Sequence, residues 1–354
     1  METKTNTENN TAPRIITHHH CIDGFASAFI AKKYLLKYLN INEDTEVLPV
    51  NPTEIELNLI ELTEQDIVLD LPKPKQKVLM WIDHHPTSKP RESAEQLREH
   101  TATHTEWRNT PSCTGLLIDY LTEKGVPLPP EVFELKKVLD KTDTASYTKE
   151  EYEQCFVNIN FKDPNLLQQM IILSTVFQTK DGVLNTQMFQ DLFTLELGPI
   201  PQLSPYFKSP FIHILAKSHF KNLEEWRALM DKNFEKDEKT RTIIQDDRKL
   251  IMKKGLPDRF YVSYKFPESP YAINLREKDI DKVAVGISKN IFDSSPSLFD
   301  VGQTCKTVGK TFGEGSGGGH KDVGGCVVHK DQANAALKHI LLEIENAQLT
   351  SKRT

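Results

Sequence analysis

The sequence lacks the features that mark secreted and membrane proteins. Its five cysteines are odd in number and scattered, with no C-x-x-C pair, so neither a disulfide framework nor a zinc knuckle is indicated. We expect reduced thiols that mostly take part in packing. No apolar run approaches the roughly 20 residues that span a bilayer. The polar start METKTNTENNTAP has no apolar core of a signal peptide. We therefore expect a cytoplasmic protein without a membrane partner.

An excess of positive charge is also lacking. The chain has 44 Lys and Arg against 50 Asp and Glu, a formal net charge of −6. Proteins that coat nucleic acid through a broad basic face depend on many phosphate contacts. This balance argues against that class and leaves short oligonucleotides or nucleotides held in a local pocket. With 354 residues, 38% of them hydrophobic, the chain can bury a sizeable core, in two globular domains more readily than one.

Apolar runs alternate with helical patterns from Arg14 onward. RIIT, TEVLPV, DIVLDL and KVLMWID are typical of strands, whereas FASAFIAKKYLLKYL, TGLLIDYLTEKG and EVFELKKVLDKTD have helical character. This alternation predicts an α/β fold, with a mostly parallel sheet flanked by helices over residues 14–200. Residues 1–13 offer almost no apolar side chain to bury and predict a disordered leader.

The second half of the chain predicts a smaller α/β domain over residues 256–354. There RFYVSYKF, YAINL, KVAVGIS and CVVH are typical of strands, GQTCKTVGKTF and QANAALKHILLEIENAQ of helices, and GEGSGGGHKDVGG of a glycine-rich loop. Residues 201–255 are expected to link the domains. They contain most of the proline-rich loop LGPIPQLSPYFKSP, and the polar run 231–254 predicts an exposed connecting helix.

Metal-binding side chains follow four apolar segments of the first domain. RIIT leads to His18, His19 and Asp23, DIVL leads to Asp70, VLMWI leads to Asp83, His84 and His85, and VLDKT leads to Asp143. In open α/β sheets, ligands gather beyond the carboxyl ends of the strands. Carboxylates and imidazoles together suit Mn²⁺ or a similar divalent ion. Each residue alone has an ordinary explanation, such as a helix cap, but chance does not easily explain clusters after several successive strands.

A second group of candidates lies in the glycine-rich segment and at the end of KVAVGIS. The candidates for substrate binding are Gly317, Gly318, Gly319, His320, Lys321, Ser288, Lys289 and Asn290. Glycines let backbone N–H groups approach an anion closely, and the histidine and lysine that follow add positive or proton-donating groups. The competing interpretations are a flexible turn for the glycines and solvated strand-end side chains for residues 288–290.

Four motifs, in this order, resemble the DHH phosphoesterase family with its associated C-terminal domain. They are HHHCIDGFASA at 18–28, IDHHP at 82–86, TDTASY at 142–147 and GSGGGHKDVGG at 315–325. The resemblance implies a hydrolase of phosphodiester or phosphomonoester bonds with two Mn²⁺ ions, or Mg²⁺ or Co²⁺, in the first domain. The second domain would hold the substrate. Length and domain content are similar to the nanoRNase and 3′-phosphoadenosine 5′-phosphate phosphatase type, which implies a short oligonucleotide or nucleotide as substrate.

The resemblance also implies roles for individual residues. Asp83, His84 and His320 would be catalytic, with Asp83 bridging the ions and His320 near the scissile phosphate. Asp23, Asp70 and Asp143 would complete the metal site, and His85 would be a ligand or a support. Both His18 and His19 fit known spacings before Asp23, and we favour His18.

One departure from the family pattern concerns Phe25, which stands where many members have a second aspartate. It leaves open a weaker metal site, and with it a non-catalytic nucleotide-binding protein. A cyclic-dinucleotide or polyphosphate hydrolase is a further alternative. The sequence does not distinguish RNA from DNA or mononucleotides, nor does it decide whether the chain forms a homodimer.

Overall fold

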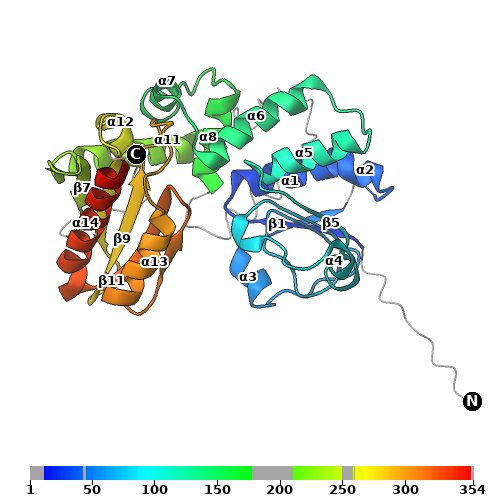
Figure 1. The fold of residues 1–354 in the computed structure, drawn as a ribbon. Coiled ribbons are helices and arrows are strands. Elements are labelled where there is room, and N and C mark those ends of the chain that lie inside the picture. The colour runs from blue at the N-terminus through cyan, green and yellow to red at the C-terminus, as the bar shows by residue number, and fades with distance from the viewer. Residues whose placement is uncertain (1–11, 43–44, 178–209, 249–257, 259, 352–354) are drawn as a thin grey trace, which may run out of the picture. The chain divides into compact units, whose positions relative to one another are not determined.

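The chain forms two compact units in a computed structural model, which describes residues 12–42, 45–177, 210–248, 258 and 260–351 (Figure 1). The first unit comprises Met1–Ser146 and Gln154–Lys217, and the second comprises Tyr147–Glu153 and Ser218–Thr354. The change of unit at 217–218 falls inside the expected linker, but the early excursion at 147–153 was not predicted. The expected leader, apart from residues 12 and 13, and most of the proline-rich loop lie outside the described residues.

The first unit contains a five-stranded, fully parallel sheet. Its order is β2 (Glu46–Val50), β1 (Arg14–His18), β3 (Ile67–Leu69), β4 (Val78–Asp83) and β5 (Ala102–Trp107). The mostly parallel sheet predicted from the alternating pattern is therefore confirmed, while β5 was not predicted. Since β1 has the second strand on one side and the third on the other, the order reverses between β1 and β3. Ligands of open α/β sheets bind at such a switch point.

The apolar strands of this sheet are buried on both faces. Ile15 and Ile82 face one hydrophobic core, whereas their neighbours Ile16 and Trp81 face another, and all four are fully buried. Near-continuous apolar runs such as VLMWI are typical of parallel strands that helices cover on both sides. Burial holds the strands rigidly, which in turn fixes the residues at their carboxyl ends.

Helices cover both faces of the first sheet. Its helical elements are α1 (Ile22–Ile30), η1 (Ala31–Leu35), α2 (Leu36–Tyr38), α3 (Pro52–Glu56), η2 (Pro86–Ser88), α4 (Ala94–His100), α5 (Cys113–Glu123), α6 (Pro130–Thr144) and α8 (Leu166–Phe177). Figure 1 shows α1 and α5 side by side on one face and α3 on the other. Ser112 caps α5 by accepting a hydrogen bond from the Gly115 amide.

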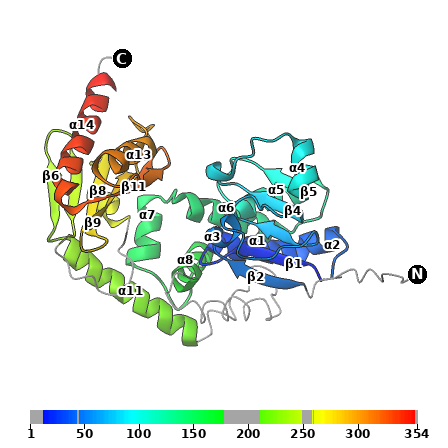
Figure 2. The same cartoon turned by 90° about the horizontal axis from the view of Figure 1, so that it is seen from below.

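The second unit contains a six-stranded mixed sheet. Its order is β10 (Gly317–Gly319), β11 (Val323–His329), β9 (Lys282–Lys289), β8 (Tyr271–Glu277), β7 (Thr242–Asp246) and β6 (Phe234–Asp237). Helices α13 (Val301–Phe312) and α14 (Ala333–Ser351), the latter preceded by η5 (Lys330–Gln332), share one core with this sheet. Figure 2 shows both helices beside β8, β9 and β11. An α/β architecture for this part of the chain is therefore confirmed.

The remaining elements are α7 (Lys149–Tyr152), η3 (Glu153–Val157), α11 (Pro210–Met230) and α12 (Tyr261–Lys265). Among the described residues, no helix combines the length and the apolar character that a membrane crossing requires.

Three local predictions in the second half are wrong. Within 231–254 the described residues form the antiparallel pair β6 and β7 and no helix, because Ile243 and Ile244 are buried there on opposite faces of the sheet. Within RFYVSYKF, residues 261–265 form α12 where a strand was expected. Asp258 accepts the Phe260 amide ahead of that helix. The glycine-rich segment is a strand pair, β10 with β11, where a loop was expected.

Candidate metal centre

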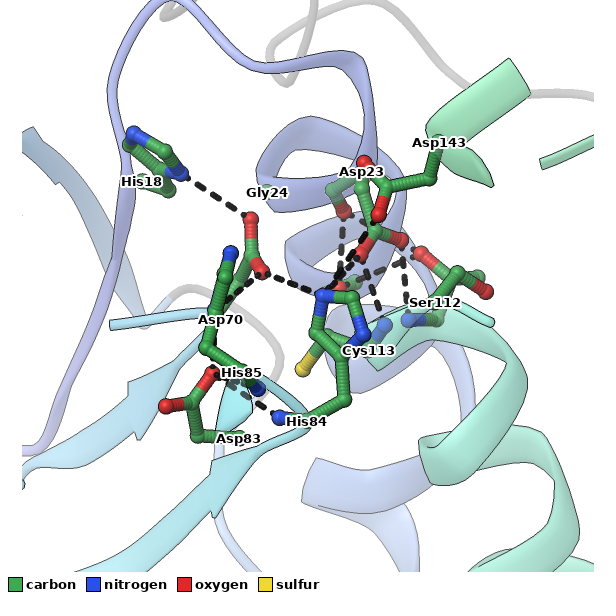
Figure 3. A network of polar contacts seen from close by, with 12 residues as sticks. His18, Asp23, Gly24, Asp70, Asp83, His84, His85, Ser112, Cys113 and Asp143 are labelled. Atoms are coloured by element: carbon green, nitrogen blue, oxygen red, sulfur yellow. Dashed lines mark hydrogen bonds and ion pairs between the residues drawn. The ribbon is translucent and has the colours of Figure 1, made fainter. Parts of the chain in front are cut away.

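A cluster of carboxylates and imidazoles lies at the carboxyl ends of three neighbouring strands (Figure 3). Its members are His18 at the end of β1, Asp70 after β3, Asp83, His84 and His85 at and after β4, Asp23 in the first turn of α1, and Asp143 in the last turn of α6. Ring nitrogens and carboxylate oxygens of Asp70, His84 and His85 lie within 4.8 Å of one another, and so do those of Asp23, His84 and Asp143. Side chains that follow all four of the apolar segments named in the first domain therefore meet in space.

Asp70 occupies the centre of the cluster. Its backbone is in the left-handed region, with φ of 57°, and its amide donates to the Ile82 carbonyl at 3.0 Å. Such backbone strain is concentrated at functional sites. One carboxylate oxygen lies 3.2 Å from Nδ1 of His18, and the other lies 3.5 Å from Nε2 of His84. The latter oxygen, Oδ1, is buried and has no hydrogen-bond partner.

Asp83 orients the two histidines that follow it. Its Oδ1 accepts hydrogen bonds from the His84 amide at 2.9 Å and from Nδ1–H of His85 at 2.7 Å. This arrangement leaves Oδ2 buried without a hydrogen-bond partner. The sequence predicts that Asp83 bridges two ions. In the structure, Asp70 belongs to two of the three groups of converging donor atoms, and Asp83 belongs to none of them.

His84 directs one ring nitrogen into the cluster. Its Nδ1–H donates to the Thr110 carbonyl at 2.9 Å, which leaves the lone pair of Nε2 available. That nitrogen lies 3.5 Å from Asp70, 3.6 Å from Asp143 and 3.7 Å from Asp23, and it has no hydrogen-bond partner. A histidine held in this way is prepared to bind a cation.

Asp23 is held by the start of α5. Its two carboxylate oxygens accept the amides of Cys113 and Thr114 at 2.6 and 2.9 Å. Gly24 follows it because a Cβ there would lie 2.5 Å from the carbonyl oxygen of His18. The D-G step of the opening motif therefore lets α1 pack closely against the end of β1.

The cluster concentrates negative charge in a buried place. Burial, together with the charges of Asp70 and Asp143, raises the pKa of Asp23 to about 8. Burial and the charge of Asp70 raise the pKa of Asp143 to about 6. Burial opposes the charged form of His84, but its close contact with Asp70 and the charges of Asp23 and Asp70 outweigh it and, without a bound ion, raise its pKa to about 10. Carboxylates arranged in this way need positive charge, and a bound divalent ion would supply it.

The donor set fits the metal that the motifs imply. Carboxylate oxygens and neutral imidazole nitrogens suit Mn²⁺ and similar divalent ions. Asp70 Oδ1, Asp83 Oδ2 and His84 Nε2 are buried atoms without hydrogen-bond partners, and such atoms need an explanation in a folded protein. A cation beside Asp70 and His84 would satisfy Oδ1 and Nε2, whose residues share one group of converging donor atoms.

The two candidate histidines of the opening motif lie in different surroundings. His18 contacts Asp70, whereas His19 belongs to none of the groups of donor atoms found among the described residues. The His19 ring lies 3.7 Å from the His20 ring, centroid to centroid, and burial followed by the charge of His20 lowers its pKa to about 4. The structure therefore brings His18, and not His19, to the cluster.

Phe25 takes part in packing. It is 3% exposed, belongs to the main core of the first unit, and its ring centroid lies 5.1 Å from that of Phe177. The residue that stands at the place of a second aspartate is therefore a core residue and not a candidate metal ligand. Its presence does not disturb the cluster.

Sequence reasoning missed three contributors to this site. The Thr110 carbonyl and the amides at the start of α5 are backbone groups, which leave no signal in side-chain patterns. Cys21 lies with His18 and Asp70, its Sγ within 4.8 Å of donor atoms of both. Its place between the histidines and Asp23 was the available signal.

Packing requires glycine at two of the three residues of β10 in the second unit. A Cβ on Gly317 would lie 2.3 Å from the Cys305 carbonyl of α13, and one on Gly319 would lie 2.3 Å from the Val323 carbonyl. A Cβ on Gly318 would meet nothing within 4 Å. His320 and Lys321 follow and are exposed. Gly318 is therefore the glycine that the fold does not require.

Residues 288–290 have different surroundings from one another. Ser288 and Lys289 are half-buried, and the lysine ammonium donates to the Asp293 carbonyl. The Asn290 side chain is buried and donates to the carbonyls of Pro267 and Ser269 at 3.2 and 3.0 Å. It thereby closes a loop of the second unit. The solvated side chain that one interpretation expected is not found at this position.

Comparisons with known proteins find similarity in structure alone. No protein-family model and no curated protein matches the sequence. The fold is similar to the pGpG-specific phosphodiesterase PggH from Vibrio cholerae, with a TM-score of 0.67 and 18% identity over 95% of this chain and 100% of that one. An exopolyphosphatase-related protein from Bacteroides fragilis matches with a TM-score of 0.50 and 12% identity over 96% of this chain and 94% of that one.

A third similar structure is RecJ in complex with Mg²⁺ from Thermus thermophilus. Its TM-score is 0.51, with 12% identity over 95% of this chain and 50% of the RecJ chain. Identities this low show a common fold. Together with the ordered motifs, they lead to one conclusion: the chain has the fold of the DHH phosphoesterases.

Proposed function

We propose that the protein is a divalent-metal-dependent hydrolase of phosphoester bonds, with two Mn²⁺ ions as its natural cofactor. The observation that carries the proposal is the buried cluster around Asp70, in which oxygen and nitrogen atoms converge without hydrogen-bond partners. A structural role alone would not place three carboxylates around one histidine nitrogen, because their mutual repulsion opposes folding.

The geometry divides the ligands into two sets, and Nε2 of His84 in one set lies 3.5 Å from Oδ1 of Asp70 in the other. One position would be held by Asp70 with His18 and His85, and the other by Asp23, His84 and Asp143. Two ions, when bound, would activate a water and neutralise charge on the phosphoryl group. The protein's own part is to hold these ligands rigidly at the strand ends, as Asp83 does for His85.

We infer that the substrate is a short linear oligonucleotide, with a dinucleotide as the first candidate. The fold likeness to a pGpG-specific phosphodiesterase, which extends over the whole of that chain, supports this choice. The net charge of −6 also favours a small substrate over a long polyanion. In the second unit, Gly318 and His320 are the candidates for binding it, because neither position is covered by other residues of that unit.

The test is hydrolysis of a panel in the presence of Mn²⁺ and in the presence of a chelator. The panel contains RNA and DNA of two to five nucleotides, 3′-phosphoadenosine 5′-phosphate, a cyclic dinucleotide and polyphosphate. We expect Mn²⁺-dependent cleavage that is fastest for the shortest linear oligonucleotides. Fastest turnover of the cyclic dinucleotide would overturn the substrate and keep the reaction class. Fastest turnover of polyphosphate, whose bonds are phosphoanhydrides, would overturn the phosphoester reaction class as well.

A pair of matched variants separates chemistry from folding. Asp70→Asn removes the shared carboxylate and should abolish turnover. Asp119→Asn removes a carboxylate of the same unit that lies 3.5 Å from Lys136 on the surface and should leave turnover unchanged. Wild-type activity in the Asp70 variant would refute the proposed centre. Binding of a dinucleotide without turnover of any substrate would favour a non-catalytic nucleotide-binding protein.

A further inference from the structure

Cys21 lies beside the metal centre, between β1 and α1. It immediately precedes α1, and the residue is partly exposed, unlike the other four cysteines, which are buried. Its Sγ, a ring nitrogen of His18 and a carboxylate oxygen of Asp70 all lie within 4.8 Å of one another. A thiol, an imidazole and a carboxylate at such distances can bind one ion together.

A second observation points to a ligand at the same carboxylate. Asp70 is 1% exposed, and its Oδ1 is buried without a hydrogen-bond partner. The oxygen of this carboxylate that contacts Nδ1 of His18, at 3.2 Å, is Oδ2, so the unused capacity to bind a cation lies on the neighbouring Oδ1. Its other contacts in the cluster are to His84 and His85, at 3.5 and 3.7 Å, beyond hydrogen-bonding distance.

Cys113 offers a contrast from the same neighbourhood. It is fully buried, and its thiol donates to the Ile82 carbonyl at 3.5 Å. It belongs to none of the groups of donor atoms found among the described residues. Cys113 thus has the surroundings of a packing cysteine, and Cys21 does not.

We propose that Cys21 supplies a thiolate ligand to the metal position formed by His18 and Asp70. The inference rests on the proposed metal centre and adds a soft donor to it. When an ion binds, the S–H proton leaves to solvent and the sulfur lone pair binds the metal. A thiolate favours Co²⁺ and Zn²⁺ over Mg²⁺, so this position would be selective for softer ions than an all-oxygen and nitrogen site.

The experiment is a titration of the full-length, chelator-treated and fully reduced protein with Co²⁺, followed by absorbance. Visible ligand-field bands report that Co²⁺ is bound, and a near-ultraviolet charge-transfer band reports a bond from thiolate to Co²⁺. We expect both in the wild type and in Cys113→Ala. We expect Cys21→Ser to keep the visible bands, lose the charge-transfer band and bind Co²⁺ on the order of tenfold more weakly. The affinity for Mg²⁺ should change little.

The outcomes separate this inference from the proposed function. Absence of visible bands from the folded wild type would overturn the metal centre and the inference together. Visible bands without a charge-transfer band in the wild type would overturn the role of Cys21 alone, as would a charge-transfer band that persists in Cys21→Ser. Circular dichroism of each variant, together with Cys21→Ala as a second replacement, ensures that a lost band reflects the missing sulfur and not a lost fold.

Discussion

Neighbouring glycines of β10 should respond to the same substitution in opposite ways. An alanine methyl at Gly317 would lie 2.3 Å from the Cys305 carbonyl and 2.8 Å from Cys326 Cβ, so either α13 or the strand must move. Overpacking of this kind costs about 1–3 kcal/mol. At Gly318 the methyl meets nothing within 4 Å, and we expect a change of at most about 0.5 kcal/mol.

Activity should respond in the opposite order to stability. Among variants that fold, Gly318→Ala should affect activity more than Gly317→Ala. If the Gly318 backbone approaches the substrate, a methyl group there will keep the two apart. We expect KM for a dinucleotide to rise about tenfold, which corresponds to about 1.4 kcal/mol of binding, with kcat little changed. Gly325→Ala is the matched control, because Gly325 is the β11 partner of Gly318 and its methyl would make an ordinary 3.5 Å contact.

Urea unfolding of the full-length protein gives the stabilities, and initial rates at varied substrate concentration give KM and kcat. One kcal/mol shifts Tm by about 2–4 °C in domains of 150–250 residues, so thermal scans should rank the variants as well. A Gly318→Ala protein as unstable as Gly317→Ala would refute the packing argument. A stable Gly318→Ala protein with the wild-type KM would refute the substrate role of this glycine.

Three further predictions concern the core, a buried ion pair and the metal. Phe25→Asp should lower the free energy of unfolding by at least about 3–5 kcal/mol without tightening Mn²⁺ binding, because the side chain lies in the core. Urea unfolding measures the stability and calorimetric titration measures Mn²⁺ binding. Tighter Mn²⁺ binding by the variant would contradict the prediction. Asp258→Asn should lower the free energy of unfolding, measured in urea, by about 3–5 kcal/mol, since it leaves Arg227 charged and buried. The control is the more exposed pair of Asp231 with Lys265, where Asp231→Asn should lower the free energy of unfolding by less than about 1 kcal/mol. Adding Mn²⁺ at about 100 times its Kd to the chelator-treated protein should stabilise it by about 2.7 kcal/mol, seen as a higher Tm, and an unchanged Tm would argue against a resident ion.

The position of the site could be predicted from the sequence because its chemistry stands at the ends of apolar runs. WIDHHP places Asp83 where a buried strand stops, and the same logic located Asp70 after DIVL. What the pattern does not contain is the order of the strands. Only that order shows that β3 lies between β1 and β4, which makes Asp70 the carboxylate that the neighbouring motifs share.

The second unit was harder to predict because contacts from distant segments override local preference there. Glycine is depleted in strands, yet Gly317 and Gly319 lie in one, where α13 and the start of β11 leave no room for a side chain. The charged run after Asp231 favours a helix by composition. Its buried Ile243 and Ile244 instead add β7 to the sheet, in parallel pairing with β8.

The short excursion of the chain at 147–153 has a consequence for any attempt to divide the protein. The chain passes between the two units at 146–147, 153–154 and 217–218, so a single cut releases neither unit whole. A fragment that ends at residue 217 would carry Tyr152 away from Asp258, to which its hydroxyl donates a hydrogen bond in the second unit. The complementary fragment would expose the pocket that this fully buried tyrosine fills. Recombination that replaces one unit with that of a related gene would therefore have to transfer two separate stretches of coding sequence at once.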